Sequence, residues 1–179
     1  SRFLMTAGPK KDIALGAIAD ELCENCEEIL AANKIDLENG EKSGLTASLL
    51  DRLRLSEERI NGMADGVIQV AALPDPVGRI LDGRTLKNGL QIEKVTVPMG
   101  VIGSIFEASP NVTSDAAALC LKAGSAVILR GGKEAFHSNM AIARVMRDAL
   151  EKAGFPRDCV ALVEDTTRQS ATELMQLSD

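Results

Sequence analysis

The sequence has no tryptophan or tyrosine, and it contains only four phenylalanines and one histidine among its 179 residues. A core without large aromatic side chains is built from aliphatic ones, a composition typical of parallel sheets and the helices that cover them. The sequence also lacks an apolar run near the ~18 residues of a membrane span, and its first residues lack the basic and long apolar segments of a secretion signal. We therefore expect a cytoplasmic protein with no membrane partner.

Basic residues are fewer than acidic ones. The chain has 20 lysines and arginines against 26 aspartates and glutamates, which gives a formal net charge of −6. A chain of this sign has no general attraction for a nucleic-acid backbone, so no nucleic-acid partner is expected. Apolar residues make up 45% of the sequence and charged residues 26%, the proportions of a folded domain rather than of a disordered chain.

Cysteine is scarce, and a chain of this length needs no disulfides, so we expect Cys23, Cys26, Cys120 and Cys159 to be reduced. The C-x-x-C spacing of Cys23 and Cys26 can mark half of a zinc site or a redox pair. Because the pair lies inside a helical pattern and no second pair stands at ligand spacing, ordinary helix cysteines are expected and no metal site is predicted. The single histidine, His137, is predicted to be exposed rather than catalytic.

The first part of the chain has helical periodicity. Apolar positions recur at helical spacing over residues 13–30, and a second helix fits residues 45–53. Ser56 is placed to cap a third helix, which the prolines of segment 74–76 end because proline lacks the N–H group that a helix interior needs. We predict an N-terminal helical region over residues 1–76.

Residues 77–97 indicate a β-hairpin. Two strand-like segments flank Asn88 and Gly89, a pair that favours the type I′ turn of a tight hairpin. A long hairpin of this kind either contacts a partner subunit or remains in solvent. We predict that it is an oligomerisation arm and that the chain forms a homo-oligomer through it.

From residue 98 onward, strands and helices alternate. The expected strands are 101–106, 126–129 and 159–163, and the expected helices are 112–123, 134–153 and 167–177. Gly124 and Gly154 are placed as C-terminal caps. This order implies right-handed crossovers and a parallel sheet covered on both faces. We predict an α/β fold with a Rossmann-like β-α-β-α-β-α sheet over residues 98–179, incomplete at its C-terminal end.

Two loops of this region combine residue types that suit a phosphate group. Residues 107–111 (EASPN) follow the first strand and lead into a helix whose free N–H groups can hold an anion. Residues 130–133 (RGGK) follow the second strand, with two glycines that allow close approach of the backbone and two cations that favour phosphate. Because ligands bind beyond the carboxyl ends of parallel strands, the two loops predict a dinucleotide site at one end of the sheet.

Neither loop matches a standard nucleotide-binding motif. There is no G-x-G-x-x-G, and Lys133 is followed by Glu134 instead of the serine or threonine of a P-loop. A surface turn with two solvated charges is therefore an alternative for residues 130–133, although the shared position of the loops favours the dinucleotide site. Asn111 can equally be an ordinary helix cap.

The segments PMGVIG (98–103), EASPNVT (107–113) and AVILRGGKE (126–134) closely resemble the γ-glutamyl phosphate reductase family, which belongs to the aldehyde dehydrogenase superfamily. The likeness extends through residues 32–33, 51–53 and 75–78. It implies NADPH-dependent reduction of γ-glutamyl phosphate to glutamate 5-semialdehyde with release of phosphate, a step of proline synthesis. In that reaction a cysteine thiolate displaces phosphate to give a thioester, and hydride from NADPH then yields the aldehyde.

The resemblance also implies residue roles. Asn111 corresponds to the catalytic asparagine that donates to the developing oxyanion. Arg130 and Lys133 correspond to the positions beside the adenosine ribose, where the charge of Lys133 favours the 2′-phosphate of NADPH. The remaining residues that we expect to bind the cofactor come from the same two loops at the strand ends and are Glu107, Ser109, Pro110, Gly131 and Gly132. Ser109 is a departure, because the family usually has arginine at this position.

The likeness covers an N-terminal portion of family chains, which continue into a catalytic domain that carries the nucleophile. None of the four cysteines has the sequence context of that nucleophile, so we expect the chain to have no turnover alone. Two alternatives stay open. One is a non-catalytic phosphate- or nucleotide-binding module; the other is an amino-acid kinase that uses Lys133 on ATP, which the missing P-loop disfavours.

Overall fold

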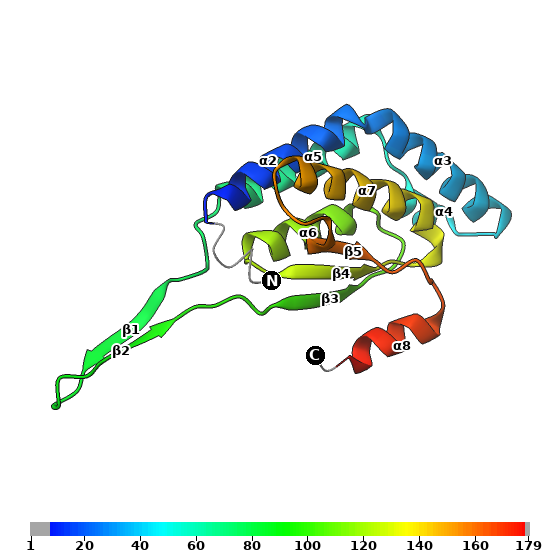
Figure 1. Ribbon diagram of the computed structural model, residues 1–179. Helices are drawn as coiled ribbons and strands as arrows, with labels where there is room; N and C mark the ends of the chain where they lie inside the picture. Colours follow the sequence, from blue (N-terminus) through cyan, green and yellow to red (C-terminus); the bar gives the residue numbers. More distant parts are fainter. Residues whose placement is uncertain (1–7, 178–179) are drawn as a thin grey trace.

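The computed structural model describes residues 8–177. The beginning of the predicted region 1–76 and the end of the predicted region 98–179 lie outside the described residues. Figure 1 shows layers of helices stacked on one face of a three-stranded sheet, a single helix on the other face, and a two-stranded hairpin that projects from the body. Before the hairpin the chain forms α2 (Lys10–Glu24), α3 (Cys26–Lys42), α4 (Ala47–Leu53) and α5 (Glu57–Ala72).

The helix expected over residues 13–30 is two helices, so the prediction of one continuous helix is wrong. The chain leaves helical geometry at Asn25, between α2 and α3. The Asn25 side-chain amide donates to the carbonyl oxygen of Glu21 at 2.8 Å and therefore competes with the regular helical bonds. The apolar spacing continues across the break because the second helix begins at once, which is why periodicity alone did not detect it.

The predicted cap of α5 is confirmed. The Ser56 hydroxyl accepts a hydrogen bond from the backbone N–H of Arg59 at 3.1 Å. The buried apolar side chains of α5 are Ile60, Met63, Ala64 and Val67, which recur at helical spacing. The helix ends at Ala72, before the prolines, as the missing N–H of proline requires.

The hairpin consists of β1 (Ile80–Thr85) paired antiparallel with β2 (Gln91–Val95). The type I′ turn is wrong, because that turn needs a positive φ at both central residues and only Gly89 has one, at 85°. The backbone N–H of Gly89 donates to the Leu86 carbonyl oxygen, and the N–H of Leu86 donates to the Leu90 carbonyl oxygen. The connection is therefore a three-residue loop in which glycine supplies the left-handed position.

The parallel sheet predicted after residue 98 is present. Its strands are β3 (Val101–Ile105), β4 (Ala126–Arg130) and β5 (Val160–Leu162), with β4 in the centre. The connections contain α6 (Asn111–Lys122), the short 3-10 turn η1 (Lys133–Ala135), α7 (Phe136–Lys152) and the 3-10 turn η2 (Arg157–Cys159), and α8 (Arg168–Gln176) follows β5. The α/β fold class predicted from the sequence is confirmed.

The helices after β3 and β4 end as their glycines predict. Gly124 has a φ of 73°, its N–H donates to the Leu121 carbonyl oxygen, and the N–H of Ser125 donates to the Cys120 carbonyl oxygen. These two bonds form a Schellman cap. Gly154 closes α7 with the same pattern. Each helix can therefore turn back into the next strand within a few residues.

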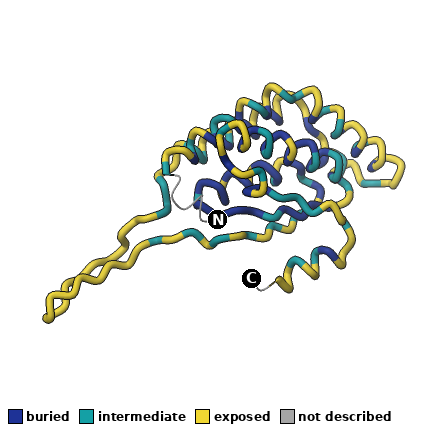
Figure 2. The backbone as a smooth tube through the Cα atoms, in the orientation of Figure 1, coloured by how far each residue is buried: buried dark blue, intermediate teal, exposed yellow. Residues whose placement is uncertain are grey.

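One hydrophobic cluster joins the N-terminal helices to the sheet. It contains the buried faces of α2, α5, α6, α7 and β4, which lie in the dark interior of Figure 2. On the opposite face of the sheet, α8 lies below β3, and the predicted cover of that face is only partial, since Val101 and Ile105 remain exposed. Within the part of the chain that the structure describes, no helix is both long and apolar enough to cross a bilayer.

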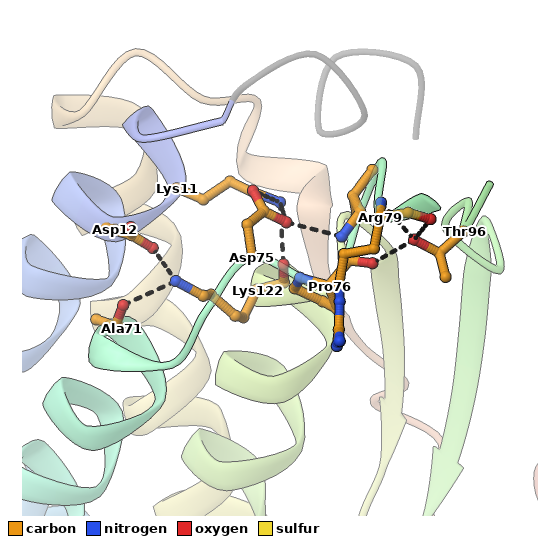
Figure 3. Close-up of polar contacts among 9 residues, drawn as sticks. Lys11, Asp12, Ala71, Asp75, Pro76, Arg79, Thr96 and Lys122 are labelled. Carbon is orange, nitrogen blue, oxygen red and sulfur yellow. Dashed lines mark hydrogen bonds and ion pairs between the residues drawn. The ribbon is translucent and has the colours of Figure 1, made fainter. Parts of the chain in front are cut away.

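The hairpin is anchored to the body by two buried lysines and their partners (Figure 3). The Lys11 side chain is almost fully buried, and its ammonium group lies 2.8 Å from Asp75 Oδ2 and donates to the Lys122 carbonyl oxygen at 3.0 Å. The Lys122 ammonium in turn donates to Asp12 Oδ1 at 2.5 Å and to the Ala71 carbonyl oxygen at 2.8 Å. We call these four charged residues, Lys11, Asp12, Asp75 and Lys122, the anchor.

The anchor fixes the point at which α5 passes into β1. Asp75 also accepts from the backbone N–H of Val77 at 2.9 Å. At the end of the hairpin's second strand, the Thr96 hydroxyl donates to the Pro76 carbonyl oxygen at 2.6 Å and accepts from the N–H of Arg79 at 2.9 Å. The base of the hairpin is therefore bonded to the same segment that the anchor holds.

We expect Asp75→Ala to destabilise the chain more than Lys11→Met. Asp75→Ala leaves a buried ammonium group without its carboxylate, which costs about 3–5 kcal/mol. Lys11→Met leaves a carboxylate that is about one third exposed and can be hydrated, which costs roughly 1–3 kcal/mol. Asp51→Ala, at an exposed pair with Arg59, is the control and should cost less than about 1 kcal/mol. Urea unfolding at neutral pH measures all three.

The Lys11–Asp75 pair makes the stability of the chain depend on pH in the acid range. Burial alone would raise the pKa of Asp75, but hydrogen bonds from Lys11 and Val77 hold it below its ordinary value. Its contribution is therefore complete above the unfolded-state pKa, about 4, and is lost as the pH falls through the lower folded-state pKa. Asp75→Ala should flatten the acid limb of the stability curve, and an unchanged acid limb would contradict the assignment.

Candidate functional site

The two loops selected from the sequence lie side by side. Ile105 at the end of β3 is in register with Arg130 at the end of β4, and the N–H of Phe106 donates to the Arg130 carbonyl oxygen at 3.0 Å. In Figure 1 the arrowheads of β3, β4 and β5 point to the same side of the molecule, opposite to the projecting hairpin. Segments 107–111 and 130–133 therefore meet at one edge of the sheet.

A cavity of about 680 Å³ opens at this edge, which we call the strand-end cavity. Four residues expected to bind a cofactor line it: Glu107, Arg130, Gly132 and Lys133. The start of α8 contributes residues 166–168, and the segment before and within α4 contributes Leu45 and Leu49. The volume falls in the range of small-molecule and cofactor sites, roughly 300–1,000 Å³.

The two cations of the second loop have different surroundings. Arg130 is 9% exposed, and its Nη2 donates to the carbonyl oxygens of Thr166 and Thr167, each at 2.7 Å. These bonds hold the beginning of α8 beside the end of β4. The side chain of Lys133 is exposed and has no hydrogen bond or ion pair within residues 8–177. Lys133 is thus the cation of this loop that is free to meet a ligand, whereas Arg130 organises the cavity wall.

Neighbouring atoms leave no room for a side chain at Gly131 and little room for one at Gly132. A Cβ on Gly131 would lie 2.1 Å from the side-chain nitrogen of Asn139, and a Cβ on Gly132 would lie 3.3 Å from the backbone carbon of Glu107. Both glycines are buried, and neither has a positive φ. The close backbone approach expected from the two glycines is therefore an approach between parts of the protein itself, which brings the two loops together.

Asn111 and Ser109 line a different cavity. It has a volume of about 430 Å³ and is bounded by the α4–α5 segment on one side and by the start of α6 on the other. We call it the arginine cavity, because its lining includes Arg52, Arg54 and Arg59. The sequence predicts Asn111 and Lys133 in one site, but the structure places them in two neighbouring cavities. Of the predicted residues, Pro110 and Gly131 line neither cavity.

Asn111 is not a helix cap. Pro110 occupies the N-cap position of α6, and the first turn has no side-chain cap. The Asn111 side-chain amide instead donates to Asp115 Oδ2, one turn further along the helix, at 3.2 Å. Burial raises the pKa of Asp115 despite this hydrogen bond. One amide hydrogen of Asn111 is thus engaged, and the other faces no partner among the residues that the structure describes.

The start of α7, which follows Lys133, is held by a residue that sequence reasoning missed. Asp36 of α3 is almost fully buried and accepts hydrogen bonds from the backbone N–H groups of His137 and Ser138 at 3.1 and 2.7 Å. The His137 ring nitrogen Nδ1 also lies 2.8 Å from Asp36. No serine, threonine, aspartate or asparagine stands directly before α7, so the sequence indicates only that its cap must come from another part of the chain.

The cysteines lie away from both cavities. Cys23 and Cys26 flank the break between α2 and α3, and Cys120 and Cys159 are buried. Burial raises the pKa of all four thiols, the opposite of what a thiolate nucleophile needs. Among residues 8–177 no group of histidine, cysteine and acidic side chains is arranged to hold a metal ion.

Comparisons with known proteins agree with this architecture. Residues 11–179 match the family described as the aldehyde dehydrogenase family. Over its whole length the chain is 51% identical to a γ-glutamyl phosphate reductase of Syntrophomonas wolfei, of which it spans 43%. It is 52% identical to a γ-glutamyl phosphate reductase of Clostridium novyi over 94% of this chain and 40% of that protein. The chain therefore spans about two fifths of the length of these relatives.

Solved structures show the same fold. The crystal structure of γ-glutamyl phosphate reductase from Thermotoga maritima matches 98% of this chain and 43% of that one, with a TM-score of 0.96 and 40% identity. The reductase from Saccharomyces cerevisiae matches 93% of this chain and 44% of that one, with a TM-score of 0.86 and 37% identity. The resemblance predicted from segments 98–103, 107–113 and 126–134 is confirmed.

Gly131→Ala should destabilise the chain by ~1–3 kcal/mol, because the added methyl group forces Asn139 out of a packed position. The Asn139 side chain is buried and accepts a hydrogen bond from Thr113 at 3.0 Å, so it cannot move freely. Gly16→Ala in α2, where nothing lies within 4 Å of the added carbon, should instead stabilise by about 0.4–1 kcal/mol. Thermal unfolding of both variants tests the pair, and equal melting temperatures would refute the crowding argument.

Proposed function

The chain belongs to the aldehyde dehydrogenase family, and we propose that it forms the cofactor-holding part of a γ-glutamyl phosphate reductase. The observation that carries the proposal is 51% identity to such a reductase over the whole of this chain. The proposed reaction is NADPH-dependent reduction of γ-glutamyl phosphate to glutamate 5-semialdehyde with release of phosphate. The two cavities at the edge of the sheet are the places in which cofactor and substrate would meet.

The strand-end cavity fits the phosphate-bearing half of NADPH. Its volume suits a nucleotide, and the exposed ammonium group of Lys133 stands at its wall without an acid partner in the described part of the chain. A 2′-phosphate needs such a cation, and NADH has no group there that would use it.

Asn111 is proposed to act on the substrate. Bound NADPH supplies the hydride that reduces the acyl carbon. When a nucleophile adds to that carbon, negative charge develops on the carbonyl oxygen, and an amide N–H held in place lowers the energy of that charge. The bond from Asn111 to Asp115 fixes the orientation of the amide and leaves its second hydrogen available for the carbonyl oxygen.

The chain alone is proposed to have no turnover. The reaction needs a thiolate that forms a bond to the acyl carbon while phosphate leaves with the electron pair of the broken C–O bond. None of the four thiols lines the strand-end cavity or the arginine cavity, and each has a raised pKa. The same observations favour a second candidate, a non-catalytic nucleotide-binding module, which shares the cofactor site and lacks the reaction.

Lys133→Glu should weaken NADPH binding at least about tenfold and leave NADH binding nearly unchanged. A charge-assisted hydrogen bond to a phosphate is worth ~1.5–3 kcal/mol, and each 1.4 kcal/mol is about tenfold in affinity. Isothermal titration calorimetry of both nucleotides measures the difference, and Lys87→Glu on the hairpin is the control with the same change of charge. Equal affinities of the unaltered chain for NADH and NADPH would contradict the proposal that Lys133 binds the 2′-phosphate.

We also propose that the hairpin joins copies of the chain. Every residue of β1 and β2 is exposed, and Figure 2 shows the entire arm outside the core. Ile80, Leu81 and Leu90 are each more than half exposed. A two-stranded ribbon with this much apolar surface is not stable on its own in water, and a second copy can cover it.

Leu81→Ser/Leu90→Ser should convert the oligomer into a monomer, because both side chains would lose the apolar surface that the partner covers. Size-exclusion chromatography with light scattering gives the mass of each species. The double variant Ile13→Ser/Ile68→Ser, which removes exposed apolar side chains from the helical body, should keep the mass of the unaltered chain. A monomer mass for the unaltered chain at every concentration would contradict the proposal.

A further inference from the structure

The arginine cavity contains more positive charge than its surroundings neutralise. Five charged residues line it: Asp51, Arg52, Arg54, Arg59 and Asp115. The two acids are already engaged, since Asp51 pairs with Arg59 at 3.1 Å and Asp115 accepts from Asn111. The side chains of Arg52 and Arg54 make no hydrogen bond or ion pair with any residue between 8 and 177. Two guanidinium groups are therefore left for a ligand.

Arg59 holds the segment that carries these two arginines. Its Nη1 donates to the carbonyl oxygens of Asp51 and Arg54 at 2.6 and 2.7 Å, and its Nη2 donates to the Asp51 carboxylate. From the other side, Asn33 of α3 bonds to the backbone on both sides of Arg54, to the Leu53 carbonyl oxygen at 2.8 Å and to the Leu55 N–H at 2.9 Å. The backbone that presents Arg54 is thus fixed before any ligand arrives.

We propose that Arg52 and Arg54 bind the carboxylate end of the substrate whose acyl carbonyl lies at Asn111. This inference rests on the proposed function. A guanidinium group presents its N–H donors in a planar fork that matches a carboxylate, so arginine is the residue suited to this group. The site makes the cavity selective for an acyl compound that carries a carboxylate at its far end, and not for acyl phosphates in general.

The placement of the groups favours the carboxylate over the phosphate. An acyl phosphate group is bonded directly to the reacting carbonyl carbon, so it lies on the same side of the cavity as Asn111, at the start of α6. Arg52 and Arg54 belong to a different segment of the lining, in and after α4, and not to the start of α6 that carries Asn111. A nucleotide is a poor candidate for these arginines, because the free cation proposed to bind its phosphate is Lys133, which lines the separate strand-end cavity.

The test compares three small ligands on the 15N-labelled chain by NMR, with backbone amide and arginine Nε–H signals as the readout. L-Glutamine carries both the carboxylate and an acyl carbonyl, 4-aminobutanamide lacks only the carboxylate, and acetyl phosphate carries only the acyl phosphate. We expect saturable shifts at Arg52 and Arg54 with L-glutamine and none with 4-aminobutanamide. Arg52→Gln and Arg54→Gln should each raise the dissociation constant at least about tenfold, whereas Arg84→Gln on the hairpin should not change it.

Three outcomes would overturn the proposal. Equal shifts with L-glutamine and 4-aminobutanamide mean that the carboxylate is not recognised, and arginine shifts with acetyl phosphate alone assign the pair to the phosphate. No arginine shift with any ligand means that Arg52 and Arg54 are solvated surface charges. NADPH is titrated into the same sample, so that a response at Lys133 without a response at the arginines refutes this inference and leaves the proposed function standing.

Discussion

Two buried polar residues of α3 hold the parts of the molecule that bear the candidate ligand groups. Asp36 accepts the N–H groups at the start of α7, next to Lys133, and Asn33 bonds to the backbone on both sides of Arg54. Ser138 connects the two, because its hydroxyl donates to Asp36 at 2.6 Å and accepts from Asn33 at 3.0 Å. An unpaired buried N–H or carbonyl costs about 1–3 kcal/mol, so these positions are strongly fixed. The two cavities therefore keep a constant relation to each other, although each combines residues of segment 45–63 with residues that lie far along the chain, at 107 and beyond.

The elements that could be predicted are those encoded by neighbouring residues. Ser56 lies three residues before the N–H group that it caps, and Gly124 follows its helix directly, so both were visible in the sequence. The parallel order followed from the alternation of strands and helices. The break at Asn25 was invisible because apolar spacing continues through it, and the hairpin turn was wrong because Asn88 keeps a negative φ. The Lys11–Asp75 pair joins residues 64 positions apart, and no local pattern reports such a contact.

The candidate site was predicted only in its coarse geometry. Parallel strands place their carboxyl ends together, and this was enough to bring segment 107–111 beside segment 130–133. The direction of each side chain was not accessible in the same way. Arg130 has the residue type of a phosphate ligand, but carbonyl oxygens of the turn before α8 take its donors, and that turn lies 36 residues away. Arg52 and Arg54 were missed as site residues because their approach to Asn111 depends on how α4 is held against the rest of the fold.

One short loop, residues 107–111, contributes to the walls of both cavities. Glu107 faces the strand-end cavity, whereas Ser109 and Asn111 face the arginine cavity. A Cβ at Gly132 would meet the backbone of Glu107 at 3.3 Å, so the floor of the first cavity is in close contact with the loop that carries the residues of the second. A side chain at position 132 would therefore press on the backbone of this loop, because packed parts of a protein leave little free space between them. The glycine at this position is what lets the walls of the two cavities lie close together, on either side of the segment that leads to Asn111.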